Sequence, residues 1–120
     1  MKIFLICPVR MVGETERKKI ENYVASLEKS GHRVHWPERD TNQNDGIGLR
    51  ICRDNRAAIK EADEIHIWWN EKSQGSLFDF GMAFAQEKKI ILANPNDVLS
   101  TTQKSFNNVL LSLHGKNKAV

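Results

Sequence analysis

One acidic residue stands among apolar neighbours in the segment Ile65–Ala85. Asp79 follows a polar, glycine-containing stretch, residues 70–76, and falls in the first turn of an expected helix. A carboxylate in such a place can attack an electrophilic carbon, for example the anomeric carbon of a sugar. Gly75 and Ser76 leave backbone N–H groups free at the helix start, where anions bind readily. A second interpretation stays open, in which Ser76 caps the helix and Asp79 only stabilises its positive end.

A basic residue, Arg10, comes shortly after the first expected strand. Its guanidinium can hold a phosphate or a carboxylate through two parallel hydrogen bonds, although a solvated surface arginine has the same sequence pattern. Cys7 is a further nucleophile to consider, but buried thiols are usually inert. The four histidines and two cysteines show no spacing typical of metal ligands, so we expect no metal site.

The elements that position these residues alternate along the chain. Continuous apolar runs without helical period predict buried strands, and 3.6-residue periodicity predicts amphipathic helices. A polar stretch, residues 38–48, has no period and predicts a long loop. Strands are expected at 2–7, 33–36, 65–69 and 89–93, and helices at 14–30, 49–62, 76–87 and 100–114.

This alternation predicts an α/β fold in a single domain, residues 1–120, with residues 115–120 as a frayed tail. We expect a three-layer, doubly wound parallel sheet of the flavodoxin or Rossmann-like kind. It has four to five strands in the order 2-1-3-4 and helices on both faces. Ligands bind such sheets at the carboxyl ends of the strands where the strand order reverses. The loops after the first and third strands flank that point, which predicts Arg10 and Asp79 at one pocket.

Composition narrows the choice of partner. The chain is 40% apolar and 28% charged, with a net charge of +3 and no basic block. This balance favours an anionic small molecule over a nucleic-acid polymer, and no apolar run is long enough for a membrane span. Two cysteines without C-x-x-C spacing predict a cytoplasmic protein.

Three short motifs carry a resemblance. The segment Ser73–Gly81, the triplet Pro8-Val9-Arg10 after the first strand, and the junction Ala62–Ile65 are similar to those of the nucleoside 2-deoxyribosyltransferase family. The likeness is greatest to its branch of deoxynucleoside 5′-monophosphate N-hydrolases and spans about residues 2–93. It implies the doubly wound fold expected above.

The resemblance also implies roles for individual residues. Asp79 occupies the position of the catalytic glutamate with a side chain one methylene shorter. Asn55, eight residues before Asp63, occupies the position of an aspartate that orients the nucleophile and the ribose, with Asp54 one step away. Helical phase favours Asn55 as the inward-facing residue of the two. The residues expected to hold phosphate or substrate are Arg10, Ser73, Gly75, Ser76, Pro8 and Phe4.

The function implied is therefore N-glycosidase or deoxyribosyltransferase chemistry on a nucleoside or nucleotide, without a cofactor. The alternative is a catalytically inactive nucleotide-binding or signalling module on the same fold. Family members assemble so that a neighbouring subunit closes the pocket, so we expect a homodimer. The identity of the base, the choice of ribose or deoxyribose, and hydrolysis or transfer are left open.

Overall fold

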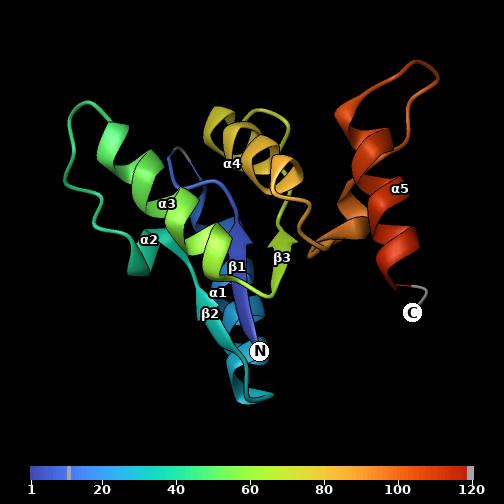
Figure 1. The fold of residues 1–120 in the computed structure, drawn as a ribbon. Coiled ribbons are helices and arrows are strands. Elements are labelled where there is room, and N and C mark those ends of the chain that lie inside the picture. The colour runs from blue at the N-terminus through green and yellow to red at the C-terminus, as the bar shows by residue number, and fades with distance from the viewer. Residues whose placement is uncertain (11, 119–120) are drawn as a thin grey trace.

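The computed structural model describes residues 1–10 and 12–118. Its centre is a four-stranded, wholly parallel sheet in the order β2-β1-β3-β4. The strands are β1 (Lys2–Ile6), β2 (Arg33–His35), β3 (Glu64–Ile67) and β4 (Ile90–Leu92). The expected strand order is confirmed, with β1 and β3 side by side at the centre (Figure 1).

Helices cover both faces of this sheet, as expected. On one face lies α1 (Glu14–Lys29), and on the other lie α3 (Leu49–Glu61), α4 (Gln74–Ala85) and α5 (Phe106–Lys118). Two short helices, α2 (Pro37–Asp40) and the 3-10 helix η1 (Pro95–Asp97), follow β2 and β4. The result is the three-layer α/β architecture that the alternation of elements predicted (Figure 1).

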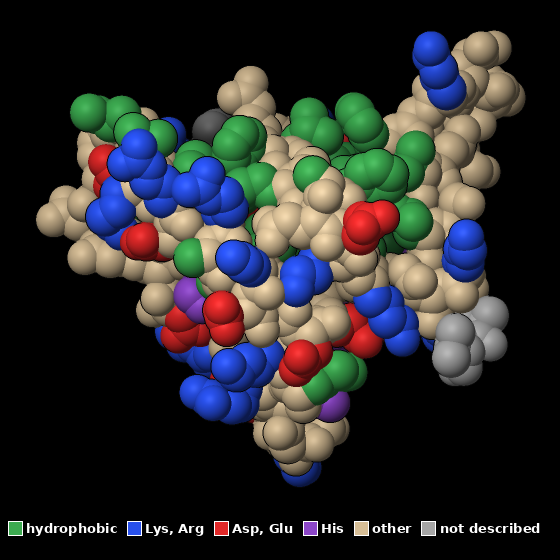
Figure 2. Space-filling model, viewed as in Figure 1, with side chains coloured by type: hydrophobic (Ala, Val, Ile, Leu, Met, Phe, Trp, Pro, Cys, Tyr) green, Lys and Arg blue, Asp and Glu red, His purple; other side chains and the backbone are tan. Residues whose placement is uncertain are grey.

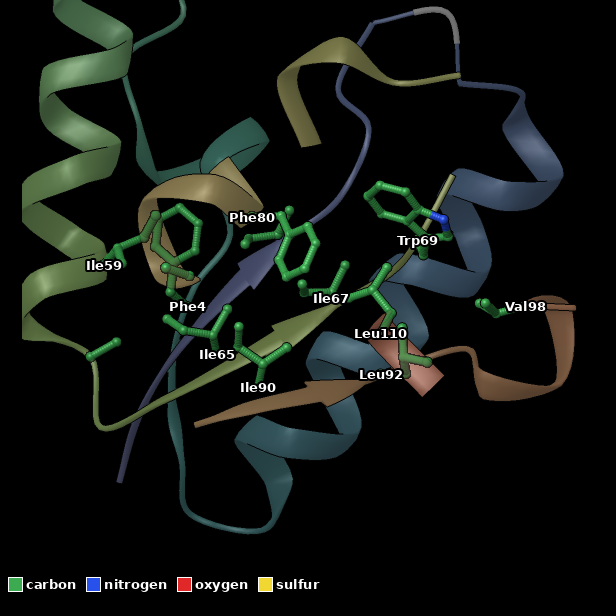
Figure 3. Close-up of a cluster of buried hydrophobic side chains, with 13 residues drawn as sticks. Phe4, Ile59, Ile65, Ile67, Trp69, Phe80, Ile90, Leu92, Val98 and Leu110 are labelled. Atoms are coloured by element: carbon green, nitrogen blue, oxygen red, sulfur yellow. The ribbon is translucent and has the colours of Figure 1, made fainter. Parts of the chain in front are cut away.

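The two faces have separate cores because side chains alternate along each strand. Phe4, Ile67 and Trp69 point to the helix layer formed by α3, α4 and α5, where they pack with Phe80 (Figure 3). Trp68 packs on the opposite face, against α1. The central strands are buried on both faces, which explains their continuous apolar runs.

Helix α4 differs from the expectation at its start. It begins at Gln74, not at Ser76, because the Oγ of Ser73 accepts a hydrogen bond from the Ser76 backbone N–H at 3.2 Å. Ser73 is therefore the capping residue. Its spacing from Phe80 predicts that Phe84 lies on the buried face of this helix, but Phe84 is 57% exposed.

The last helix is displaced along the chain, since it covers residues 106–118 instead of 100–114. From the first turn of this helix, the side chain of Asn108 bonds the backbone N–H and carbonyl of Thr101, and the Oγ of Ser105 accepts from the Asn108 N–H at 3.1 Å. These local bonds compete with helix formation, so the segment before Phe106 folds as a loop.

Within residues 1–10 and 12–118 the sheet has four strands, and the C-terminal end of α5 covers the edge where a fifth would pair. The outer edge of β4 is bonded by side chains of α5: Leu92 N–H donates to His114 Nδ1 at 2.9 Å, and Asn117 Nδ2 donates to the Ile90 carbonyl at 2.7 Å. The helix takes the place that an optional fifth strand would occupy. Residues 115–118 of the expected frayed tail are helical, and residues 119 and 120 lie outside the described residues.

Apolar side chains gather along the upper edge of the molecule, over α4 and α5 (Figure 2). Leu77 and Phe78 of α4 are 39% and 54% exposed, and Phe106 at the start of α5 is 54% exposed. No helix within residues 1–10 and 12–118 combines the length and the apolar character needed to cross a membrane.

Candidate active site

The start of α4 supplies two free backbone N–H groups. Because Ser73 Oγ takes the Ser76 N–H, the pair expected at Gly75 and Ser76 is instead the pair at Gln74 and Gly75. Neither of these two groups donates to another described residue. A Cβ added at Gly75 would meet no atom within 4 Å, so an anion has open access to this end of the helix.

Ser76 is directed inward. Its side chain is 1% exposed, and its Oγ is the single fully buried side-chain oxygen or nitrogen without a hydrogen-bond partner among the described residues. A hydroxyl that is left unpaired in this way costs free energy, and such groups often mark a functional site. In a helix, Ser76 and Asp79 lie one turn apart and so share the buried face of α4.

Asp79 is buried and unpaired. The residue is 9% exposed, and its carboxylate makes no hydrogen bond or ion pair with another described residue. Burial raises the pKa of the Asp79 carboxyl from 3.8 to about 7. A carboxyl of this kind changes charge near neutral pH, as a nucleophile or a general acid–base group must.

The neighbouring helix settles which of Asn55 and Asp54 faces inward. Asn55 is 6% exposed, whereas Asp54 lies in solvent and forms an ion pair with Arg50 at 2.6 Å. This orientation agrees with the helical phase. Asp54 is therefore held away from the buried face of α3, and Asn55 is the residue of the two that can reach a ligand.

The end of β1 supplies the remaining candidates. Pro8 is buried, and Arg10 is exposed and makes no ion pair with another described residue. Phe4 is 0% exposed and stacks on the ring of His35, so it packs in the core and is shielded from any ligand in this structure. Burial raises the pKa of the Cys7 thiol to about 12, so this cysteine is uncharged and weakly nucleophilic at neutral pH.

Asn55 and Asp79 occupy similar positions along two helices that contact each other. Both α3 and α4 begin at the edge of the sheet where the strands end, and the two helices pack against each other. Asn55 follows the first residue of α3 by six positions and Asp79 that of α4 by five. At about 1.5 Å per residue, the two residues therefore lie roughly 9 and 7.5 Å from the starts of their helices, measured along each axis.

Two surface hollows, of about 510 and 260 Å³, lie along the first turns of α1 and beside β2. Neither is lined by Asp79. Within residues 1–10 and 12–118, no group of three or more histidine, cysteine, aspartate or glutamate side chains is arranged to hold a metal ion.

Two contributors to the site carried no signal in the sequence. Gln74 offers a backbone N–H, which any residue type at that helix position would provide. Thr41, inside the stretch expected to be a polar loop, is 5% exposed and donates its hydroxyl to Asn55 Oδ1 at 2.8 Å. A threonine in a polar stretch has no pattern that distinguishes it from its neighbours.

Comparison with known proteins comes from solved structures. No protein-family model matches the chain, and no curated protein matches it either. The CMP N-glycosidase BcmB of Clostridium botulinum is 29% identical, with 77% of this chain and 67% of that chain covered and a TM-score of 0.56. A 2-deoxyribosyltransferase from Bacillus psychrosaccharolyticus is 21% identical, with 91% and 90% covered and a TM-score of 0.65. The chain thus has a nucleoside 2-deoxyribosyltransferase-like fold.

Proposed function

We propose that this protein cleaves the N-glycosidic bond of a (deoxy)nucleoside 5′-monophosphate, as an N-glycosidase or a deoxyribosyltransferase, with Asp79 as the nucleophile. The observation that carries the proposal is the Asp79 carboxyl, which is buried and unpaired among the described residues and has a pKa raised to about 7. The likeness to a CMP N-glycosidase and a 2-deoxyribosyltransferase supports the same class of reaction.

The reaction proceeds through a covalent intermediate. An ionised Asp79 oxygen attacks C1′ of the sugar, and the C1′–N bond breaks with its electron pair passing to the base, which takes a proton from solvent. The product is a glycosyl ester of Asp79. Water then attacks C1′ and loses a proton to solvent, while the ester bond between C1′ and Asp79 breaks with its electron pair returning to the carboxylate, which releases the free sugar phosphate. Attack by a second base at the same carbon gives transfer instead of hydrolysis.

The phosphate is held at the sheet edge above Asp79. Arg10 supplies a charged, bidentate donor, and the free N–H groups of Gln74 and Gly75 supply two more donors at the positive end of α4. Ser73 keeps the hydrogen of its capping hydroxyl to donate to a phosphate oxygen. Each donor lies at the carboxyl end of a strand or just beyond it, where a doubly wound sheet binds its ligand.

Release of free base from a panel of nucleosides and nucleoside 5′-monophosphates tests the proposal. We expect Asp79→Asn to abolish release while nucleotide binding persists, because an amide keeps the shape but is not a nucleophile. Asp79→Glu adds one methylene and moves the carboxylate farther from α4, and we expect it to keep turnover. Asp97→Asn, a matched change at an exposed aspartate in η1, serves as the control.

Two outcomes would reject parts of this proposal. Undetectable release by the wild type and both Asp79 variants, with nucleotide binding intact, would leave a catalytically inactive nucleotide-binding module. Equal release by wild type and Asp79→Asn would show that another residue is the nucleophile.

The phosphate half of the site has its own test. Arg10→Ala should weaken binding of a nucleoside 5′-monophosphate about ten- to a hundredfold and leave the matching nucleoside unchanged, since a charge-assisted hydrogen bond contributes about 1.5–3 kcal/mol. Calorimetric titration of both ligands measures this difference. Equal losses for the two ligands would remove Arg10 from the phosphate site.

We also propose that the protein forms a homodimer through the apolar surface of α4. Phe78 and Phe84 are 54% and 57% exposed on this helix, which also carries Asp79. A second copy packed there would exclude water from the reaction. Light scattering should give twice the monomer mass for wild type and the monomer mass for Phe84→Asp. A monomeric wild type at working concentration would contradict the proposal.

A further inference from the structure

Thr41 joins two side chains from different elements. It follows α2 directly and is 5% exposed, although it belongs to a polar stretch. Its Oγ1 lies 2.8 Å from His35 Nε2, on β2, and 2.8 Å from Asn55 Oδ1, on α3. The ring of His35 is itself held by stacking on Phe4, with centroids 5.2 Å apart and planes 9° from parallel.

Hydrogen counting gives this chain of bonds a direction. A threonine hydroxyl has one hydrogen, and an amide oxygen only accepts. The hydroxyl hydrogen therefore goes to Asn55 Oδ1, and the hydroxyl must accept from the Nε2–H of His35. Burial lowers the pKa of His35, which favours the neutral ring. A neutral imidazole protonated at Nε2 donates through that nitrogen.

The opposite end of the Asn55 amide stays available. Asn55 Nδ2 makes no hydrogen bond to another described residue, and it is not among their fully buried unpartnered atoms, so it keeps access to solvent. Ile59, one helical turn further along α3, packs in the same cluster as Phe80, the neighbour of Asp79. The free amide therefore belongs to a helix that packs against α4, the helix that carries Asp79.

We infer that Thr41, held by His35, is a positioning residue that turns the Asn55 amide so that its N–H groups donate to an oxygen of the bound sugar. This inference rests on the proposed function. Thr41 acts through Asn55 and does not touch the ligand. Without the hydroxyl the amide can rotate by half a turn and offer its oxygen, which cannot donate to the same sugar oxygen.

Kinetics of three variants tests the inference. Thr41→Val removes the hydroxyl at constant shape, and we expect kcat/KM for base release to fall about tenfold, the effect of one lost hydrogen bond near the reacting carbon. Thr41→Ser keeps the hydroxyl and should stay within twofold of wild type. Thr101→Val is the matched control, because that hydroxyl bonds Gln103 and Ser105 before α5, away from the site. All rates are compared on folded protein, as judged by circular dichroism.

A second measurement does not depend on activity. Nitrogen NMR of the His35 ring should show hydrogen on Nε2 in the wild type, and binding of deoxyribose 5-phosphate should shift the Asn55 side-chain amide in the wild type but less in Thr41→Val. A His35 ring with its hydrogen on Nδ1 would mean that Thr41 donates to His35 and that the Asn55 amide is reversed, which overturns the inference.

The two proposals fail in different ways. Absence of base release in the wild type rejects the proposed function, and the NMR result then decides the role of Thr41 alone. Equal kcat/KM in wild type and Thr41→Val, in an enzyme that does release base, rejects the positioning role and leaves the proposed function standing.

Discussion

Two carboxyl groups are buried on opposite faces of the sheet, and the structure treats them differently. Glu64 on β3 is 6% exposed and Asp79 on α4 is 9% exposed. Glu64 accepts a hydrogen bond from His66 at 2.7 Å and lies 3.6 Å from the Lys89 ammonium. Asp79 has no such partner among the described residues. The two carboxylates are similarly buried, but only Glu64 has hydrogen-bond and ionic partners. We therefore interpret Glu64 as a carboxylate that supports the fold and Asp79 as one that is left reactive.

Tyr23, His66 and Glu64 form a continuous chain of hydrogen bonds. Burial raises the pKa of Tyr23 to about 12, so its phenol remains a donor, and it bonds His66 Nδ1. Burial also lowers the pKa of His66, with the bond to Glu64 acting in the opposite sense, and the neutral ring donates from Nε2 to Glu64. Each polar atom in the chain has its partner, so no ligand is needed to complete it.

The largest effect that we expect from the difference between Asp79 and Glu64 is on the free energy of unfolding. Asp79 binds a proton in the folded state up to about pH 7 and in the unfolded state only to about pH 3.8, so folding is penalised as pH rises between these values. The difference corresponds to about 4 kcal/mol at most. Asp79→Asn should therefore raise the free energy of unfolding by up to that amount at pH 8 and change it little at pH 3.5. Denaturant unfolding at both values measures this, and an unchanged stability at pH 8 would show that Asp79 is solvated or paired.

The second prediction concerns the rate. The ionised form of Asp79 is the nucleophile, so kcat/KM for base release should be constant above about pH 8 and fall about tenfold for each pH unit below 7. Between pH 8 and pH 5 the loss is roughly a hundredfold. A profile that stays flat to pH 5 would indicate a carboxyl with an ordinary pKa.

Substitution at the paired carboxylate should have the opposite sign. Glu64→Gln replaces a charged acceptor by a neutral one for the His66 N–H, which should lower the free energy of unfolding by about 1 kcal/mol at pH 8. Base release per folded molecule should not change, because Glu64 lies on the α1 face of the sheet. Stabilisation by this variant, comparable to that expected for Asp79→Asn, would remove the distinction between the two groups.

The smallest effect on the free energy of unfolding is expected at Tyr23, the outer residue of the Tyr23–His66–Glu64 chain of hydrogen bonds. Tyr23→Phe removes the hydroxyl that bonds His66 Nδ1 at a half-buried position. We expect a loss of about 0.5–1 kcal/mol in the free energy of unfolding, with water replacing part of the bond. Thermal unfolding of Tyr23→Phe and Glu64→Gln, measured in parallel, tests this. A larger loss of unfolding free energy for Tyr23→Phe would show that the Tyr23–His66 hydrogen bond contributes more than the His66–Glu64 bond.

Sequence periodicity alone predicted most of the architecture. Strand alternation over residues 65–69 predicts Trp68 and Trp69 on opposite faces, as the structure shows. Helical phase predicted Asn55 as the inward-facing residue, and the structure confirms it, with Asp54 in solvent. Strand order followed from the alternation of elements and the handedness of crossovers. These features depend on local geometry that each segment carries within itself.

Element ends and polar partners were decided by tertiary structure. The start of α4 depends on which of Ser73 and Ser76 caps the helix, and α5 reaches Lys118 while His114 and Asn117 bond the edge of β4. Whether a carboxylate is paired depends on residues far away in sequence. Tyr23 and His66 are 43 positions apart.

Asp79 illustrates which properties the sequence predicts and which only the tertiary structure decides. Its place in a strand–loop–helix unit is visible in the sequence, and so is its candidacy as a nucleophile. The expected position in the first turn is wrong, because α4 begins at Gln74 and Asp79 is its sixth residue. That it lies buried without a partner, and that Asn55 is held by Thr41 from 14 positions upstream, follows only from how the helices pack on the sheet. Periodicity determines which face a side chain takes, whereas desolvation and hydrogen-bond direction depend on atoms that only the folded chain brings together.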